Sequence, residues 1–409
     1  MRNAECGMRI SGAQAVGLRS AFRVACFASR ALRSSSSVNP HSAFRIPQLI
    51  VFCLLLATQV VAGGAWKAQK SGTLAWLRAV YFVDEARGWA VGSRGALLST
   101  TDGGRTWAVR RAPTEDTLRD VYFVNEREGW LVCDRSIYLL RTKEEARSYL
   151  LKTTDGGASW SRVGVTGADV DVLLTRVAFI DNARGWAFGE MGALYATTDG
   201  GASWSRQIVP TKHLLLGGAF LAAGQLWLVG AGNTILYNPD GARWRAGNVP
   251  ATAAAAGATR FNAVSFVEER RGWAVGEGGL VLATLNGGRS WFRQESNVDV
   301  NLSDVKFIDA DEGWAVGAEG TIIHTLDGGA HWQLEASGTR HTLERLSVAP
   351  RARAWAVGFG GTIINYAGHA ADTTAPARPP QLNLPGRETQ REQPRERPRR
   401  VTRNRATTH

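Results

Sequence analysis

The sequence predicts an all-β fold, a seven-bladed β-propeller with four-stranded blades, and two recurring tryptophans predict it. A tryptophan usually preceded by glycine recurs in steps of 41 to 56 residues, at Trp89, Trp130, Trp186, Trp227, Trp273, Trp314 and Trp355. A second tryptophan closes six of the seven units, at Trp107, Trp160, Trp204, Trp244, Trp291 and Trp332. Each unit holds four short apolar runs separated by turn residues, which is the pattern of one propeller blade in about 40 to 45 residues.

The ends of the repeat region predict that the ring closes on itself. Seven opening tryptophans face only six closing ones, so one closing strand is missing from the last repeat. The segment Ala65–Thr73 reads like His331–Thr339, which places Trp66 where Trp332 stands. We therefore expect the N-terminal strand around Trp66 to close the last blade, which ends near Ala367. A repeat divided between the two ends of a chain indicates a ring.

The first and second repeats give the expected strand positions and one insertion. In the first repeat we expect strands over residues 79–83, 88–91, 96–99 and 106–110. In the second, Trp130 and Trp160 are 30 residues apart, against 17 or 18 residues between the equivalent tryptophans of other repeats. The excess lies around Arg141–Tyr149, and its charges predict an excursion into solvent.

A turn motif precedes each closing tryptophan. In Thr100–Trp107 it reads S/T-x-D-x-G-x-T-W, in which the aspartate accepts backbone N–H groups and glycine supplies a positive φ. The motif resembles the Asp-box, or bacterial neuraminidase repeat. We predict that its side chains clamp the turns and serve no catalytic, cofactor-binding or metal-binding role; they are Asp102, Asp155, Asp199, Asp240, Asn286 and Asp327.

Composition divides the chain into three parts. Residues 1–62 form a leader whose apolar run Leu49–Val61 ends in small residues, as in an export signal, and an uncleaved membrane anchor is the alternative. Residues 63–367 form the ring, and the Pro- and Arg-rich residues 368–409 are expected to be a disordered tail. The ring is therefore expected to be exported, to the periplasm, a lumen or the medium.

The net charge of +12 comes from the two ends of the chain. The leader holds seven of the 48 basic residues and the tail nine, which leaves 32 in the ring against 31 acidic residues. A nearly neutral ring argues against nucleic acid as a partner. The tail run Arg395–Arg405 suits peripheral contact with anionic lipid, polysaccharide or an acidic partner, although a solvated tail is the simpler interpretation.

Cysteine usage predicts neither a disulfide framework nor a zinc site. Cys6, Cys26 and Cys53 lie in the leader, and Cys133 stands alone in the repeats, where we expect a buried thiol. The sequence therefore implies no cofactor, and we expect a monomer.

A glycan-acting propeller is one functional alternative. Sialidases share the Asp-box and use a Phe-Arg-Ile-Pro motif, which here is Phe44–Pro47, ahead of the export signal and outside every blade. Tyr81 and Tyr122 occupy equivalent strand positions, as packing residues would. Paired acids with an arginine triad in a deep pocket would favour this class, and a basic face without paired acids would favour a binding protein.

The whole-repeat pattern, an aromatic first strand, then GWAVG, G-x-x-G and T-x-DGG-x-x-W, resembles the photosystem II stability and assembly factor family over about residues 65–367. That resemblance implies an exported, non-catalytic seven-bladed propeller. It also implies an Arg-rich patch and binding of a newly made reaction-centre protein as client.

Repeat register suggests where a client would bind. Arg78 and Arg119 begin the first strands of blades one and two, and Arg94 and Arg135 lie in the turns between the second and third strands of the same blades. Arg340 lies in the loop that leads into blade seven, next to blade one. We expect these arginines to form a basic arc on one face, suited to carboxylate and amide recognition. Scattered solvated arginines are the alternative.

Overall fold

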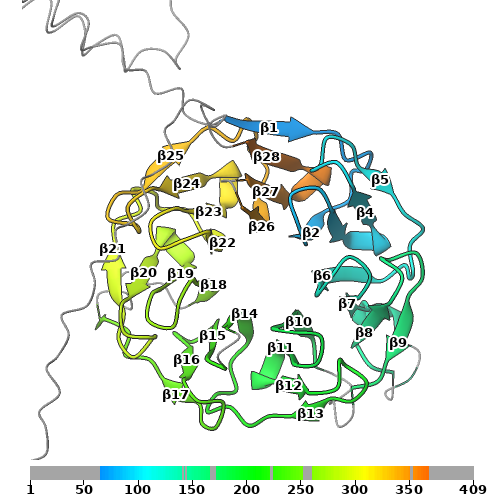
Figure 1. The fold of residues 1–409 in the computed structure, drawn as a ribbon, viewed down its shortest axis with the longest axis horizontal. Coiled ribbons are helices and arrows are strands. Elements are labelled where there is room, and N and C mark those ends of the chain that lie inside the picture. Colours follow the sequence, from blue (N-terminus) through cyan, green and yellow to red (C-terminus); the bar gives the residue numbers. More distant parts are fainter. Residues whose placement is uncertain are drawn as a thin grey trace, which may run out of the picture. The chain divides into compact units, whose positions relative to one another are not determined.

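The structure, a computed structural model, describes residues 65–140, 142, 145–165, 172–221, 224–251, 260–350 and 353–367. These residues form seven four-stranded antiparallel sheets arranged around a central axis (Figure 1). The predicted seven-bladed propeller is confirmed. The expected leader and tail lie outside the described residues. Within the described part of the chain, no helix has the length and apolar character needed to cross a bilayer.

Blades are numbered in chain order. Blade 1 comprises β2 (Leu77–Phe82), β3 (Gly88–Gly92), β4 (Leu97–Thr100) and β5 (Ala108–Val109). Blade 2 comprises β6 (Thr117–Phe123), β7 (Gly129–Asp134), β8 (Ser148–Thr153) and β9 (Ser161–Val163). Blade 3 comprises β10 (Leu174–Phe179), β11 (Gly185–Gly189), β12 (Leu194–Thr197) and β13 (Ser205–Arg206). Blade 4 comprises β14 (Leu215–Phe220), β15 (Leu226–Gly230), β16 (Ile235–Asn238) and β17 (Arg245–Ala246).

The remaining blades follow the same plan. Blade 5 comprises β18 (Phe261–Phe266), β19 (Gly272–Gly276), β20 (Val281–Thr284) and β21 (Phe292–Gln294). Blade 6 comprises β22 (Leu302–Phe307), β23 (Gly313–Gly317), β24 (Ile322–Thr325) and β25 (Gln333–Glu335). Blade 7 comprises β26 (Leu343–Ala349), β27 (Arg353–Gly358), β28 (Ile363–Ala367) and β1 (Ala65–Gln69). Short 3-10 turns are η1 (Ser93–Gly95), η2 (Ile137–Leu139), η3 (Glu190–Gly192), η4 (Glu277–Gly279), η5 (Ala318–Gly320) and η6 (Phe359–Gly361).

The N-terminal strand closes the ring, as the tryptophan count predicts. β1 pairs antiparallel with β28, with Trp66 opposite Tyr366 and Ala65 opposite Ala367. Trp66 is buried, and its ring lies 5.6 Å from that of Tyr366. Pairing with β1 satisfies an edge of β28 that would otherwise be open.

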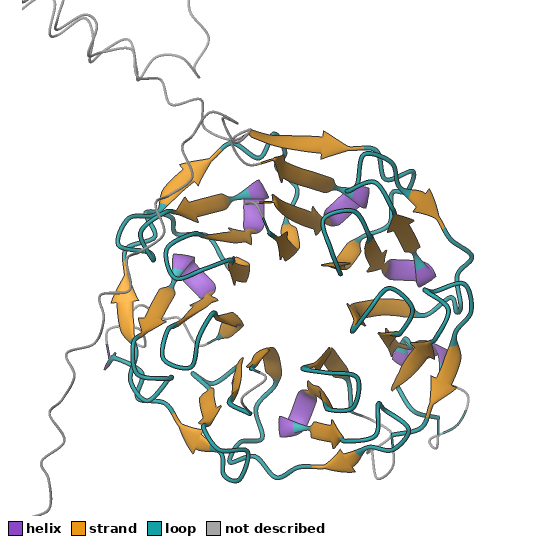
Figure 2. Cartoon of the chain, in the orientation of Figure 1, coloured by secondary structure: helices purple, strands orange, loops and turns teal. Residues whose placement is uncertain are grey.

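The 3-10 turns lie between the second and third strands of their blades (Figure 2). In blades 1, 3, 5, 6 and 7 the loop that leads into the next blade crosses this turn. Gly95 N–H donates to the carbonyl of Asp116, and Gly361 N–H donates to the carbonyl of Ala75. Gly361 has a φ of +74°, and a Cβ there would lie 1.9 Å from the carbonyl oxygen of Thr73. Glycine is required because both the conformation and the crossing loop exclude a side chain. These crossings put the turns and connecting loops on one face of the ring.

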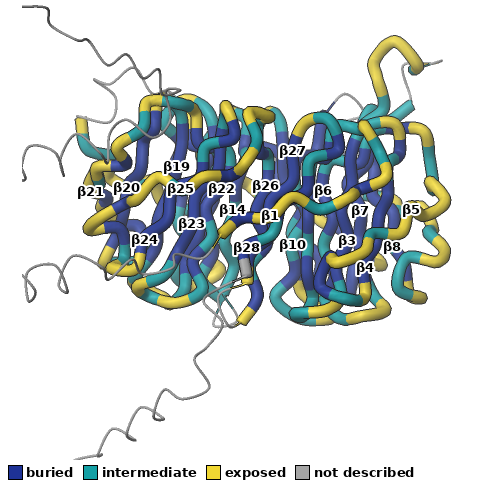
Figure 3. Tube along the Cα trace, turned by 90° about the horizontal axis from the view of Figure 1, so that it is seen from above, coloured by how far each residue is buried: buried dark blue, intermediate teal, exposed yellow. Residues whose placement is uncertain are grey.

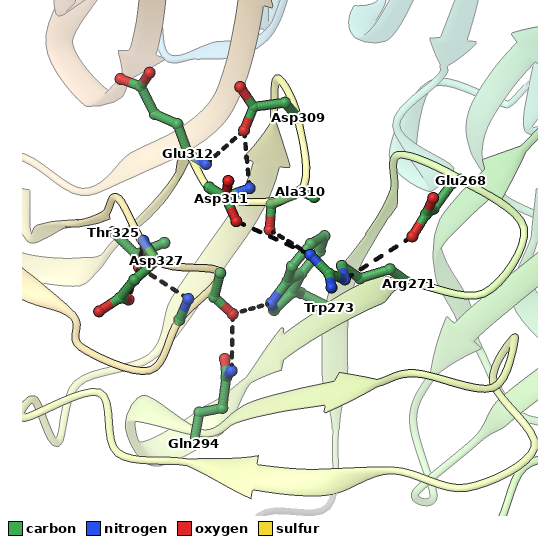
Figure 4. Close-up of polar contacts among 12 residues, drawn as sticks. Glu268, Arg271, Trp273, Gln294, Asp309, Ala310, Asp311, Glu312, Thr325 and Asp327 are labelled. Carbon is green, nitrogen blue, oxygen red and sulfur yellow. Dashed lines mark hydrogen bonds and ion pairs between the residues drawn. The ribbon is translucent and has the colours of Figure 1, made fainter. Parts of the chain in front are cut away.

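Aromatic side chains fill the junctions between blades. At junction 5/6, the Trp273 ring stacks on Phe307 of the next blade at 3.5 Å, and Trp332 meets the same Phe307 edge-on at 5.8 Å. Trp273 Nε1 also donates to the carbonyl of Gly328 at 2.9 Å (Figure 4). Equivalent stacks are Trp89–Phe123, Trp130–Phe179, Trp186–Phe220, Trp227–Phe266 and Trp355–Phe82. The core therefore lies between blades, and the outermost strands are the exposed ones (Figure 3).

The turns before the closing tryptophans are held by side-chain hydrogen bonds. Asp102 Oδ1 accepts from Thr106 N at 2.9 Å and from Thr100 Oγ1 at 2.8 Å, and Asp102 Oδ2 accepts from Thr106 Oγ1 at 2.6 Å. The backbone bond recurs at Asp155, Asp199, Asn286 and Asp327. The hydroxyl bond to Oδ2 recurs at Asp155 and Asp199, whereas Asn286 Nδ2 donates to Ser290 Oγ and Asp327 Oδ2 contacts the His331 ring. Asp240, whose turn is one residue shorter, instead accepts from Ala242 N at 3.0 Å.

Two sequence expectations for blade 2 have different outcomes. Cys133 is a buried free thiol, as predicted, and burial raises its pKa to about 12. The predicted solvent excursion over Arg141–Tyr149 is wrong at its end, because Ser148 and Tyr149 are buried in β8. The Tyr149 hydroxyl donates to Asp116 Oδ2 at 2.7 Å, which holds it in the sheet. The excursion includes η2 instead, where Tyr138 is 90% exposed.

Candidate partner-binding site

The central channel opens on the face that carries the 3-10 turns, and a β-bulge in every blade shapes this opening. The pairing of the first and second strands shifts register after a leucine or phenylalanine near its start, which leaves one residue unpaired. Such bulges re-aim side chains at the rims of closed sheets. The seven bulge residues all line one cavity of about 450 Å³, which we call the mouth: Arg78, Arg119, Thr175, Leu216, Asn262, Ser303 and Glu344.

The two bulge arginines occupy neighbouring blades and influence each other. The guanidinium carbon of Arg78 lies 3.5 Å from the centre of the Trp76 ring, and Arg78 Nη1 lies 3.7 Å from Glu344 Oε1. Burial lowers the pKa of Arg78; Glu344 opposes this effect, and the charge of Arg119 adds to it. Arg119 Nε donates to Asp134 Oδ2 at 2.8 Å. Both fixed side chains keep part of their donor sets for a ligand, since a guanidinium carries five N–H donors.

Sequence reasoning missed three further arginines in the mouth. Arg176 and Arg345 directly follow the bulge residues of blades 3 and 7, and Arg260 directly precedes the first strand of blade 5. Five arginines thus line the mouth against two glutamates, Glu277 and Glu344. The signal was present as the pattern Leu-x-Arg at Leu174–Arg176 and Leu343–Arg345. Arg78 directly follows its leucine, whereas Arg176 and Arg345 stand two places after theirs. A comparison that looks only at the position equivalent to Arg78 therefore misses them.

The other three predicted arginines do not line the mouth. Arg94 has a φ of +56° in η1 and borders a separate groove between blades 7 and 1. Arg135 donates to Asp116 at 3.2 Å and to Glu145 at 3.0 Å. Arg340 is exposed in the loop before β26. The structure therefore gathers Arg78 and Arg119 of the five, and places the others farther out.

Below the mouth, two buried carboxylates tie neighbouring blades together. Asp120 Oδ2 accepts from Val177 N of the next blade at 3.0 Å, and Asp304 Oδ2 accepts from Leu346 N at 2.9 Å. Arg345 Nη2 lies 3.7 Å from Asp120 Oδ1. Burial raises the pKa of Asp120 to about 6, against the opposing charge of Arg176. The shared bond to the next blade gives these two aspartates a structural role.

The channel tyrosines pack against each other. The rings of Tyr81 and Tyr122 are 4.7 Å apart, and the Tyr122 hydroxyl donates to the carbonyl of Phe179. Burial raises the pKa of both phenols, which opposes use as a nucleophile. Across the described residues, no group of three or more His, Cys, Asp or Glu side chains is placed to hold a metal ion.

With this geometry in hand, comparison with known proteins identifies the family. The sequence profile of the family described as Photosynthesis system II assembly factor YCF48 matches residues 58–165, 113–212, 206–297 and 290–367. The chain belongs to this family. The resemblance inferred from the repeat pattern is thereby confirmed. A search of curated proteins gave no match.

Solved structures share the fold at low sequence identity. "YCF48 bound to D1 peptide" is 21% identical with a TM-score of 0.61, and the match covers 76% of this chain and 97% of that one. YCF48 from Cyanidioschyzon merolae is 22% identical with a TM-score of 0.60, over 74% and 98% of the two chains. A xyloglucanase from Xanthomonas campestris is 13% identical with a TM-score of 0.55, over 74% and 53%. At these identities the similarity establishes the propeller fold alone.

Proposed function

We propose that this member of the YCF48 family is a non-catalytic, exported ring that binds a segment of a protein client in its mouth. The client we favour is a subunit of a membrane complex, because a solved relative is described as bound to a D1 peptide. Export, a monomeric state and contact of the tail with anionic lipid stay predictions.

One observation carries the proposal: adjacent blades place Arg78 and Arg119 at equivalent bulges on one rim. A guanidinium recognises carboxylates and carbonyls through a fixed fork of donors. Because both arginines stand on strands of a closed ring, little conformational freedom is lost on binding. The five mouth arginines against two glutamates favour an acidic segment, and salt should weaken its binding.

Affinity capture from membrane extract tests this proposal. The parent chain is compared with Arg78→Glu/Arg119→Glu and with the control Arg206→Glu/Arg245→Glu, which makes the same charge change at exposed positions of β13 and β17. We expect the parent and the control to recover the same salt-sensitive client, and the mouth variant to lose it at an unchanged Tm. Recovery of that client by all three proteins would reject the mouth as the binding site.

A glycan-acting role is the second candidate, and the raised pKa of Asp120 beside Arg345 is the observation that favours it. A carboxyl that titrates near pH 6 in a cavity of about 370 Å³ resembles a general acid. Its bond to Val177 N and the weakly acidic tyrosines favour the binding role. Hydrolysis of a sialoside or another glycoside by the parent, lost in Asp120→Asn, would replace our proposal with this one.

A further inference from the structure

The seven blade junctions allow the chain to be compared with itself. At junctions 1/2, 3/4, 5/6, 6/7 and 7/1, where the structure describes the whole loop, the loop leading into one blade crosses the turn between the second and third strands of the blade before it. Three equivalent sequence positions can be compared at all seven junctions: the first residue of the turn region, and the residues one and three places before the leucine or phenylalanine that precedes the bulge of the next blade. At junction 7/1 they are Phe359, Trp76 and Leu74, and all three are apolar.

The six other junctions each carry at least one charge at these positions. The charged residues, from junction 1/2 to junction 6/7, are Glu115, Asp134, Glu190, Lys212, Arg260, Glu277, Asp299 and Arg340. The fold therefore forms with polar side chains at this place. Folding therefore does not explain why junction 7/1, unlike the other six junctions, has three large apolar residues at these positions.

These side chains form a groove open to solvent, which we call the 7/1 groove. Its volume is about 680 Å³, and Leu74, Trp76, Val109 and Phe359 line it together with Arg94 and Arg110. Leu74 is 89% exposed, Val109 61% and Phe359 50%, so the groove presents apolar surface to water. The Trp76 and Phe359 rings are packed edge-on at 5.4 Å, which gives the groove a rigid wall.

The 7/1 groove and the mouth are separate cavities that share one lining side chain. Trp76 lines both cavities, with Phe359 against it in the groove and the Arg78 guanidinium over its ring. Trp76 Nε1 donates to Glu344 Oε1 at 3.0 Å, which fixes the indole between the two. An apolar pocket and a basic rim thus lie on the two sides of Trp76.

We propose that the 7/1 groove receives an apolar side chain of the same acidic segment whose charge the mouth holds. This inference rests on the proposed function and specifies its partner: an extended peptide that carries an acidic group and, a few residues away, an aromatic or aliphatic side chain. Charge complementarity supports one occupant for both cavities, because Arg94 and Arg110 continue the basic character of the mouth along the groove. Burial of one such side chain should strengthen binding about tenfold.

Fluorescence anisotropy with synthetic peptides tests the groove on the full chain. One set of labelled peptides carries two glutamates and a phenylalanine one, three or five residues away, and a matched set carries serine in place of phenylalanine. The groove variant is Leu74→Ser/Phe359→Ser. The control, Leu285→Ser/Leu334→Ser, removes two exposed leucines from blades 5 and 6.

We expect the parent and the control to bind the best phenylalanine peptide about tenfold more tightly than its serine match. The groove variant should bind both peptides with the affinity that the parent shows for the serine peptide. Equal affinities for the two sets in the parent would overturn the groove and leave the mouth intact. Arg78→Glu/Arg119→Glu should abolish binding of both sets; binding unaffected by that change would instead count against the mouth.

Discussion

Junctions 5/6 and 6/7 each pack two neighbouring blades around a buried tryptophan, but the groups that contact this tryptophan differ. At junction 5/6, Trp273 stacks on Phe307 and donates its N–H to the carbonyl of Gly328, which also accepts from Gln294 Nε2 at 2.9 Å (Figure 4). The two donors belong to blade 5, and the accepting carbonyl lies in the turn between β24 and β25 of blade 6. The contact is apolar at its centre and carries no net charge.

At junction 6/7 the partners of Trp314 are missing. Val348 stands where the other first strands have phenylalanine, and β1 replaces the turn whose glycine carbonyl would accept the indole N–H. Trp314 Nε1 is buried without a hydrogen-bond partner among the described residues. His324 of the same blade stacks on Trp314 instead, at 4.5 Å.

Charged groups secure the closing strand in place of the missing turn. Trp66 Nε1 donates to Glu335 Oε2 at 2.6 Å, and His324 Nδ1 lies 2.8 Å from Glu335 Oε1. His324 Nε2 lies 3.3 Å from Glu312 Oε1. The difference is in how the buried aromatic groups are held: a backbone carbonyl of a continuous turn accepts the Trp273 indole N–H at junction 5/6, whereas the carboxylate of Glu335 holds Trp66 and His324 where β1 closes blade 7. Such contacts depend on pH.

Among the changes that test this difference between the junctions, removal of the closing strand should have the largest effect on folding. Deletion of residues 63–73 removes β1, opens the edge of β28 and leaves Glu335 without Trp66. We expect aggregation or loss of cooperative unfolding, because an unpaired edge templates further strand pairing. Deletion of residues 1–62 serves as the control. A deletion of residues 63–73 that melts like the parent would show that the ring does not depend on this strand.

The charged junction predicts a pH-dependent step that junction 5/6 lacks. Burial disfavours the charged imidazole, but its contacts with the carboxylates of Glu312 and Glu335 outweigh that effect and raise the pKa of His324 to about 8. Because the folded pKa lies above the unfolded value of about 6.5, this stabilisation is complete below pH 6.5 and is lost as pH rises through 8. We expect a loss of about 1–2 kcal/mol across that range.

Urea unfolding at a series of pH values measures this step. The variant His324→Gln should flatten the profile between pH 6.5 and 8.5. His331→Gln is the control, because that side chain is 82% exposed and lies outside the junction. A profile for His324→Gln that keeps the slope of the parent would remove His324 as the cause.

Changes in the turns of continuous blades should have the smallest effects. The hydrogen bonds from Thr106 lower the pKa of Asp102 to about 2. Since this folded pKa lies below the unfolded value, the stabilisation is present above about pH 4 and is lost as pH falls toward 2. Asp102→Ala should lower Tm by about 2–4 °C at pH 7 and leave client affinity unchanged. Thermal melts and the capture assay check this; normal folding with lost binding would show a functional aspartate.

Repeat spacing predicted the ring and its seven blades, because the same aromatic residues recur at each junction. The closing role of Trp66 followed from the count of seven opening and six closing tryptophans. The end of the blade 2 insertion was not predictable from charge. Tyr149 lies in the sheet, where its hydroxyl donates to Asp116 of the loop before β6. The spacing of the repeats does not reveal this partner.

The mouth was predicted in part. Arg78 and Arg119 share a register and were found, whereas Arg176 and Arg345 follow the bulge by one residue and were missed. A bulge changes the direction of side chains without changing the spacing of the sequence. Only the strand pairing therefore shows that both the bulge residues and the residues directly after them line the mouth. Arg94, Arg135 and Arg340 share the predicted turns and loops, but these lie farther from the channel.

Site-specific photo-cross-linking in the source cell tests the central claim most directly. A photoreactive residue is placed at Ser303, in the mouth, or at Ser205, on the exposed strand β13. The account predicts one cross-linked protein client from position 303, absent when Arg78→Glu/Arg119→Glu is introduced, and no such product from position 205. A client that cross-links equally from both positions, or from position 303 regardless of the two arginines, would contradict it.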